Sequence, residues 1–167
     1  MGVTNFEDYI ERRCNTVGTK PCITIMQWAY ELSLPSDVWD HDATQTMIRE
    51  VGMSVCLYND LASLKKEVAD GDVDSAVPIL VWNEDLGAQQ AVDKVIKMIE
   101  QSWIRLLDAE RRLSSVGETE QFKHDIMVLA AGCKDIVVGH VAYSLKAARY
   151  MAGATLNRED NSFRVVL

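Results

Sequence analysis

The chain has 167 residues, of which 48% are hydrophobic, and it carries a formal net charge of −8. This length and composition are sufficient for one globular domain with its own core, and they argue against disorder. The acidic balance argues against nucleic acid or an anionic membrane surface as a partner, because both require a basic face.

The cysteines and histidines form no recognisable metal or disulfide pattern. The four cysteines are widely separated with no CxxC pair, and the three histidines form no HExxH motif. The N-terminus has no apolar signal-like core, and the longest apolar stretch is interrupted by Lys134 and Asp135. We therefore expect a cytoplasmic protein with reduced thiols and no stable membrane anchor.

Apolar periodicity predicts two helices in the first part of the chain. Thr4 followed by Glu7 fits a capping box, which opens a short helix that ends near Gly18. Residues 21–34 are apolar on most sides and predict a buried helix, which Pro35 ends.

Three longer helices are predicted after a polar loop. Residues 43–69 form the longest and least amphipathic segment, which indicates a central helix packed on several sides and ended by Gly71. Residues 88–107 are amphipathic with helical period, and a last helix is predicted over 122–151. Strand-like alternation and internal repeats are absent. The sequence therefore predicts an all-α antiparallel helical bundle, a single domain over residues 1–167.

The stretch NDLASLKKE places a polar stripe on the central helix. Asn59, Ser63 and Glu67 recur at spacing i, i+4, i+8, so their oxygen-bearing side chains share one face. A solvated helix face is the simplest explanation. Gly52 and Cys56 precede them on the same stripe, and we interpret these small residues as open space, which favours a cavity wall. Amide, hydroxyl and carboxylate oxygens in such a wall are ligands that Mg²⁺ accepts.

The same nine residues resemble a motif of a known family. NDLASLKKE is similar to the second metal-binding motif of class I terpene synthases, (N/D)Dxx(S/T)xxxE. In that family the Asn, Ser and Glu hold one magnesium ion of a trinuclear cluster on the substrate diphosphate. The resemblance therefore implies Mg²⁺ as cofactor, with Asn59, Ser63 and Glu67 as its ligands. Lys66 adds a cation that could reach a phosphate, although an ordinary surface charge is the alternative.

A second segment, near the C-terminus, resembles the family's terminal element. YSLKAARY has an aromatic residue, Tyr143, six positions before an Arg-Tyr pair, here Arg149 and Tyr150. The resemblance implies that this pair binds the diphosphate. A helix-end cation beside a capping aromatic ring is the alternative explanation.

A third segment, near the N-terminus, resembles the one that carries the family's diphosphate-sensing arginine. In YIERRCNTVG the family's spacing assigns that role to Arg13, with Thr16 at the linker position and Val17 at the effector position. At the effector position the family uses a backbone carbonyl to approach the substrate. The three segments occur in the family's order and span most of the chain.

The family also has an aspartate-rich motif, and we assign no segment of this chain to it. Asp37, Asp40 and Asp42 are explained by a solvated loop and a helix N-cap. We therefore expect the chain to correspond to the C-terminal half of a terpene synthase domain, with the aspartate-rich N-terminal half absent. A fragment, a short protein that completes its cavity by pairing, and a relic that binds diphosphate without turnover remain open alternatives.

The resemblance implies a carbon–oxygen lyase that ionises a prenyl diphosphate, with farnesyl diphosphate and sesquiterpene chemistry expected. Trp28, Tyr30 and Tyr58 are candidates for the apolar wall around the cation, with core packing as the alternative. We expect self-association, aggregation or a partner chain. The rival interpretation is a helical interaction module without turnover. The residues that the resemblance assigns to the diphosphate are Arg13, Lys66, Arg149 and Tyr150.

Overall fold

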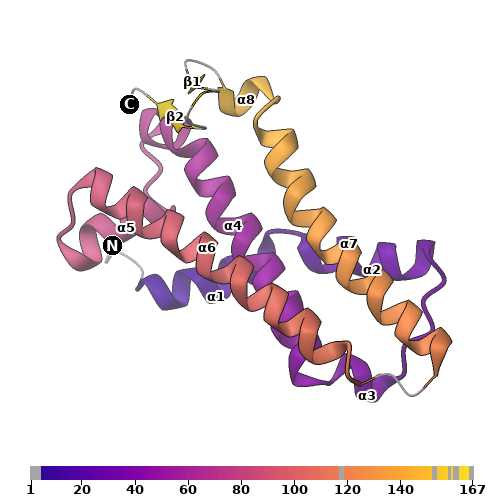
Figure 1. Cartoon of the computed structure of the whole chain (residues 1–167). Coiled ribbons are helices and arrows are strands. Elements are labelled where there is room, and N and C mark those ends of the chain that lie inside the picture. The colour runs from indigo at the N-terminus through magenta and orange to yellow at the C-terminus, as the bar shows by residue number, and fades with distance from the viewer. Residues whose placement is uncertain (1–4, 117–118, 152–153, 158, 160–161, 166–167) are drawn as a thin grey trace.

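Helices make up most of the computed structural model, which describes residues 5–116, 119–151, 154–157, 159 and 162–165. The predicted all-α class is confirmed, with one short hairpin added (Figure 1). The elements in chain order are α1 (Phe6–Thr16), α2 (Thr19–Ala29), α3 (Ser36–Trp39), α4 (Asp42–Asp70), α5 (Ala76–Glu84), α6 (Ala88–Leu113), α7 (Glu120–Ser144), α8 (Ala148–Met151), β1 (Ala154–Asn157) and β2 (Ser162–Val165).

The central helix is α4, as the sequence predicted. It packs against α6, α7, α1, α2 and α5, and every residue from 51 to 57 is buried. Figure 1 shows α4 running behind α6 and beside α7, with its C-terminal end near α8 and the hairpin. The helix begins after His41, whose Nδ1 accepts from the Ala43 amide at 3.1 Å. It ends at Gly71, which adopts the left-handed conformation (φ +75°) that glycine tolerates best.

Two apolar clusters flank α4 and hold the other helices on it. One joins α4 to α6, α7 and the α2–α3 region, and the other joins α4 to α1, α5 and α6. The largest fully buried side chains in these clusters include Tyr9, Met47, Leu57, Leu106 and Leu129. Burial of such side chains is the main source of stability, at about 1.5–3 kcal/mol each.

The prediction that residues 21–34 form a buried helix is wrong. The helix there, α2, spans 19–29, and only Thr19 and Ile23 are buried in it. Trp28 is 81% exposed, on a helix whose main neighbours among the described residues are α1, α4 and α7. The helix is apolar on most sides, but in the described part of the chain only one side of it packs against other helices.

The start of α1 and its junction with α2 differ in detail from the sequence prediction. Asn5 is the N-cap, and its side chain accepts from the Glu7 amide at 2.8 Å, whereas Thr4 lies outside the described residues. The break between the helices falls at Val17 and Gly18, and Gly18 has a φ of +86°. Pro21 belongs to the first turn of α2, where its missing N–H costs little.

The predicted helix over 122–151 is interrupted in the structure. The α7 helix ends with Leu145 as C-cap, and α8 begins at Ala148 after a tightened turn. The expected absence of strands is also wrong, because β1 and β2 form an antiparallel pair beyond α8. The class remains all-α, since this hairpin is the only sheet among the described residues.

Within the described residues, α7 is the one helix long and apolar enough to span a membrane by length and composition. Core helices of soluble proteins meet the same criterion. One face of α7 packs on α2 and α4 through Ile126, Leu129, Ala130 and Cys133. The expectation that the chain has no membrane anchor stays a prediction.

Candidate functional site

The polar stripe of α4 is held together by hydrogen bonds between its own members. Ser63 Oγ lies 2.6 Å from Glu67 Oε1 and 2.7 Å from the Asn59 carbonyl oxygen, and Ser63 is 2% exposed. The shared face predicted from the i, i+4, i+8 spacing is therefore present. Because a hydroxyl has one proton to donate, the lone pairs of Ser63 Oγ remain available to a further ligand.

Two residues predicted from distant segments meet this stripe at Asn59. The Asn59 Nδ2 amide donates to the Tyr150 hydroxyl at 2.9 Å, and Arg13 Nη2 lies 3.4 Å from Asn59 Oδ1. These contacts join α1 to α4 across 46 positions of the chain, and α4 to α8 across 91 positions.

Asp60 and Tyr9 form a buried polar pair beside the stripe. The Tyr9 hydroxyl donates to Asp60 Oδ2, which also accepts the Ala76 amide at 3.0 Å. Arg13 Nη2 lies 3.5 Å from Asp60 Oδ1. Burial raises the pKa of the Asp60 carboxyl, and these three donors oppose that rise. Neither residue was predicted from the sequence; the available signal was a carboxylate two positions after the largely apolar run of residues 51–58.

The interpretation of Gly52 and Cys56 as open space is wrong. A Cβ on Gly52 would lie 3.3 Å from the Cys14 carbonyl oxygen, so the absent side chain allows α1 to approach α4 closely. Cys56 is fully buried in an apolar cluster, and burial raises the pKa of its thiol to about 12. Both residues pack the helices against each other, and the stripe's polar character begins at Asn59.

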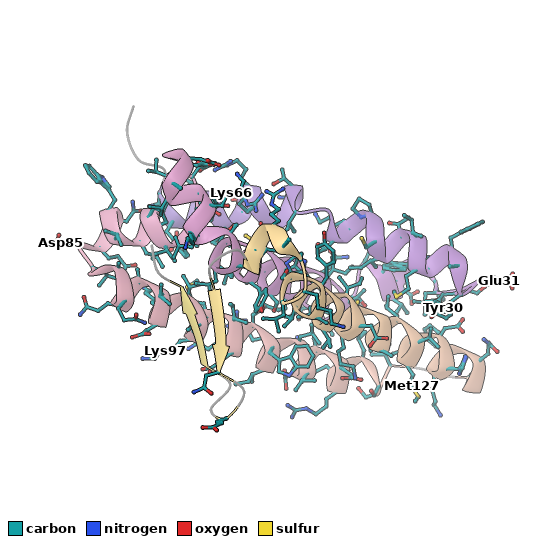
Figure 2. All side chains as sticks on the ribbon, turned by 90° about the horizontal axis from the view of Figure 1, so that it is seen from above. Tyr30, Glu31, Lys66, Asp85, Lys97 and Met127 are labelled. Atoms are coloured by element: carbon teal, nitrogen blue, oxygen red, sulfur yellow. The ribbon has the colours of Figure 1, made fainter. Side chains whose placement is uncertain are left out.

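Lys66 and Arg149 lie near the predicted site without contacting the stripe. The Lys66 ammonium pairs with Asp70 at 2.5 Å, and Figure 2 labels this lysine on the last turns of α4. Arg149 is exposed and its guanidinium stands 5.7 Å from the centre of the Tyr150 ring. Tyr143 is also exposed, so of the terminal element only Tyr150 touches the stripe.

The predicted linker and effector residues lie at the break between α1 and α2. Thr16 is exposed, and its hydroxyl donates to the Arg12 carbonyl at 3.1 Å. Val17 is the C-cap of α1. Its carbonyl cannot accept a helical bond from residue 21, because Pro21 has no N–H.

The candidate wall residues separate into two groups. Trp28 and Tyr30 are exposed on and just after α2, so neither belongs to the core or lines the stripe. Tyr58 is half-buried, and its ring stands edge-on to His140 of α7 at 6.0 Å. The three loop aspartates that we set aside, Asp37, Asp40 and Asp42, are all exposed, which agrees with a solvated role.

The oxygen donors of the stripe fit a hard divalent cation. Glu67 Oε2 is buried without a hydrogen-bond partner, and Asn59 Oδ1 has only the long contact to Arg13. No group of three His, Cys, Asp or Glu residues suited to a metal occurs in the described part of the chain. Asn59, Ser63 and Glu67 would therefore hold such an ion through three different oxygen types, which suits Mg²⁺ better than zinc.

Comparison with known sequences agrees with this geometry. The family described as "Terpene synthase family 2, C-terminal metal binding" matches residues 2–105. Sesquiterpene synthase Agr1 of Cyclocybe aegerita is 29% identical over 164 residues, which cover 98% of this chain and 46% of that protein. Terpene cyclase 4 of Gibberella fujikuroi is 31% identical, over 87% of this chain and 39% of its own length. The chain thus spans less than half the length of these relatives.

Solved structures show the same fold. Cucumene synthase T181N aligns with a TM-score of 0.77 at 20% identity, over 89% of this chain and 49% of that one. The linalool/nerolidol synthase from Streptomyces clavuligerus, in complex with 2-fluorogeranyl diphosphate, gives 0.78 at 18% identity, over 86% and 50%. These similarities confirm the helical architecture.

Proposed function

Because the chain belongs to the terpene synthase family, we propose that it provides the metal- and diphosphate-binding wall of an enzyme that ionises a prenyl diphosphate. The observation that carries this proposal is the meeting of Arg13, Asn59 and Tyr150 from three separate helices. A packing module has no need for buried, unpaired carboxylate and guanidinium atoms at such a junction.

The donors and acceptors at this junction suit a metal–diphosphate complex. Magnesium held by Asn59, Ser63 and Glu67 would neutralise the charge that builds on the leaving diphosphate. The Arg13 side chain is 25% exposed and its buried Nε has no partner, so the guanidinium would meet an anion through its exposed part. Tyr150 would donate from the opposite side of Asn59, with Arg149 beside it.

The substrate that we propose is farnesyl diphosphate, and the product class is sesquiterpene. The support is that relatives named as a sesquiterpene synthase and a sesquiterpene cyclase match this chain over nearly its whole length. A structural neighbour holds 2-fluorogeranyl diphosphate, which supports the prenyl diphosphate class. Lys66 would bind a phosphate by releasing Asp70. Val17 would present its carbonyl to the substrate.

The direct test is calorimetric titration of the purified chain with inorganic diphosphate, with and without Mg²⁺. We expect binding that requires Mg²⁺ and is lost in the Asn59→Ala, Ser63→Ala and Glu67→Ala triple variant. Incubation with geranyl, farnesyl and geranylgeranyl diphosphates and Mg²⁺ should give slow turnover or none by this chain alone, with farnesyl diphosphate preferred. Absence of Mg²⁺-dependent diphosphate binding, together with capture of a partner chain, would favour the interaction module instead.

A further inference from the structure

Asp60 is a buried carboxylate whose surroundings give its two oxygens different partners. The residue is 1% exposed and lies directly beside Asn59 in the sequence. Oδ2 accepts the Tyr9 hydroxyl and the Ala76 amide, so α1 and the start of α5 are both tied to it. Oδ1 faces the Arg13 guanidinium at 3.5 Å. An ionised carboxylate in this setting is costly unless its charge is compensated, and Arg13 is the compensating cation.

Arg13 is shared between Asp60 and the candidate metal ligand Asn59. Its Nη2 atom lies 3.5 Å from Asp60 Oδ1 and 3.4 Å from Asn59 Oδ1, while its Nε has no partner. The guanidinium therefore stands at the edge of the stripe with an unused donor.

The contact between Arg13 and Asn59 is incompatible with a metal ion on the same oxygen. An Asn oxygen that coordinates a divalent cation cannot also face a guanidinium closely, since the two positive charges repel each other. A metal bound at Asn59 Oδ1 would thus remove one of the contacts that hold Arg13, which also interacts with Asp60, Tyr9 and Cys56. The contact with Asp60 is unaffected, because Tyr9 and Ala76 hold the carboxylate through Oδ2 while Oδ1 faces Arg13.

We propose that Asp60 is a positioning residue that keeps the Arg13 guanidinium beside the stripe when Asn59 becomes a metal ligand. Its role is to hold a free arginine donor next to the metal, so that metal and diphosphate bind cooperatively. This inference rests on the proposed function for its ligands, but the link between Asp60 and Arg13 can be measured without any ligand.

The variant that isolates this role is Asp60→Asn. An Asn side chain retains one oxygen for Tyr9 and Ala76 and places an NH₂ group, a second donor, opposite Arg13. Tyr9→Phe is the second variant, because it removes the hydroxyl that contacts both Asp60 and Arg13 while leaving the charge of the carboxylate. Asp74→Asn is the matched control: Asp74 pairs with the neighbouring Arg12 at 2.6 Å, and it lies in the segment that precedes α5.

Two measurements separate the inference from the proposed function. The first is the side-chain Nε–H signal of Arg13 in nuclear magnetic resonance spectra of the ligand-free chain, with thermal unfolding to verify folding. We expect the Arg13 signal to broaden or exchange faster in Asp60→Asn, to change less in Tyr9→Phe, and to stay unchanged in Asp74→Asn. The second is the affinity for Mg²⁺ and diphosphate, which should fall about tenfold in Asp60→Asn, as expected for loss of a charge-assisted contact.

Each outcome tests either the positioning role of Asp60 or the proposed function. An altered Arg13 signal without diphosphate binding by any variant supports the positioning role and rejects the proposed function. If Asp60→Asn folds and shows the same Arg13 signal and the same diphosphate affinity as the wild type, the positioning role is wrong. If Asp60→Asn does not fold, Tyr9→Phe takes its place: an unchanged Arg13 signal and affinity in that variant reject the inference.

Discussion

At the residue scale, the two oxygens of Glu67 have different surroundings. Oε1 accepts the Ser63 hydroxyl at 2.6 Å, whereas Oε2 is buried without a partner. A buried acceptor that lacks a partner lowers stability, and the cost is larger when the group is charged. A cation bound at Oε2 would offset this cost. Folding alone does not explain why the oxygen is left without a partner.

We expect Glu67→Gln to weaken Mg²⁺-dependent diphosphate binding by about tenfold or more, because divalent cations require the carboxylate charge. The same change should leave thermal stability close to that of the wild type, since the Gln oxygen can still accept the Ser63 hydroxyl and the unpartnered Oε2 loses its charge. Calorimetric titration and thermal unfolding of the same samples measure the two effects.

The control for this substitution has to be an acidic residue outside the network. Asp60 is unsuitable because its carboxylate holds Arg13, although it faces away from the stripe. Asp108 on α6 is exposed and pairs only with its helix neighbours, Arg111 and Arg112. Equal losses of affinity in Glu67→Gln and Asp108→Asn would indicate a diffuse acidic surface in place of a metal site.

His140 gives the stability of the protein a dependence on acid pH. Its Nε2 is buried without a partner, and burial lowers the pKa of the imidazole below its ordinary value of 6.5. The stabilising contribution of the neutral ring is thus complete above the unfolded-state pKa and is lost as pH falls through the folded-state pKa. We expect the melting temperature to fall less between about pH 7 and pH 5 in His140→Gln than in the wild type.

The matched substitution is His124→Gln, at an exposed position of the same helix. It should retain the wild-type response to pH. Parallel pH profiles for His140→Gln and the wild type would show that protonation of His140 does not oppose folding.

The sequence predicted the residues that share a helix face and, through the family resemblance, Arg13 and Tyr150, but it did not predict the pairing of Tyr9 with Asp60. Asn59, Ser63 and Glu67 share a face because helical geometry requires it. Pairing of Tyr9 with Asp60 connects positions 51 residues apart, which no local pattern records. Gly52 was misread because a small residue is equally suited to open space and to close helix approach.

At the element scale, α1, α4 and α6 follow their local signals, whereas the predicted helices over residues 21–34 and 122–151 differ from the structure. The α4 helix ends at a glycine, as its sequence predicts. The break between α7 and α8 has no glycine or proline at 145–147, so propensity favoured a continuous helix. The bond from Asn59 to Tyr150 accompanies this break, and such a contact between distant residues outweighs local preference.

Two glycines of α7 should respond oppositely to alanine. A Cβ on Gly132 would lie 1.8 Å from the Met26 sulfur of α2, whereas a Cβ on Gly139 would meet nothing within 4 Å. We expect Gly132→Ala to lower the free energy of unfolding by about 1–3 kcal/mol through overpacking. Gly139→Ala should raise it by about 0.5–1 kcal/mol through helix propensity.

Urea unfolding followed by circular dichroism measures both changes. The flexible end of Met26 could move aside, and the double variant Gly132→Ala with Met26→Ala tests this by removing the clash. A Gly132→Ala protein as stable as Gly139→Ala would contradict the close approach of α2 and α7.

At the scale of the whole molecule, large apolar side chains remain exposed at the end where α2 and α7 lie together. We call the residues Ile25, Trp28, Tyr30 and Met127 the α2–α7 face; Ile25 is 63% and Met127 65% exposed. Figure 2 shows Tyr30 and Met127 at the same end of the molecule. Large exposed apolar side chains on neighbouring helices favour association, so we expect this face to be covered by protein in solution.

We therefore expect the isolated chain to self-associate, with a solution mass above the 18.7 kDa of one copy. The double variant Trp28→Ser with Met127→Gln should shift the chain toward the monomer, because burial of these side chains drives association. Trp82→Ser is the matched control, since Trp82 is 73% exposed on α5, away from this face. Light scattering after size-exclusion chromatography, over a range of concentrations, measures the mass. A wild-type chain that stays monomeric throughout would show that the α2–α7 face is stable in water, and loss of association in Trp82→Ser alone would move the interface to α5.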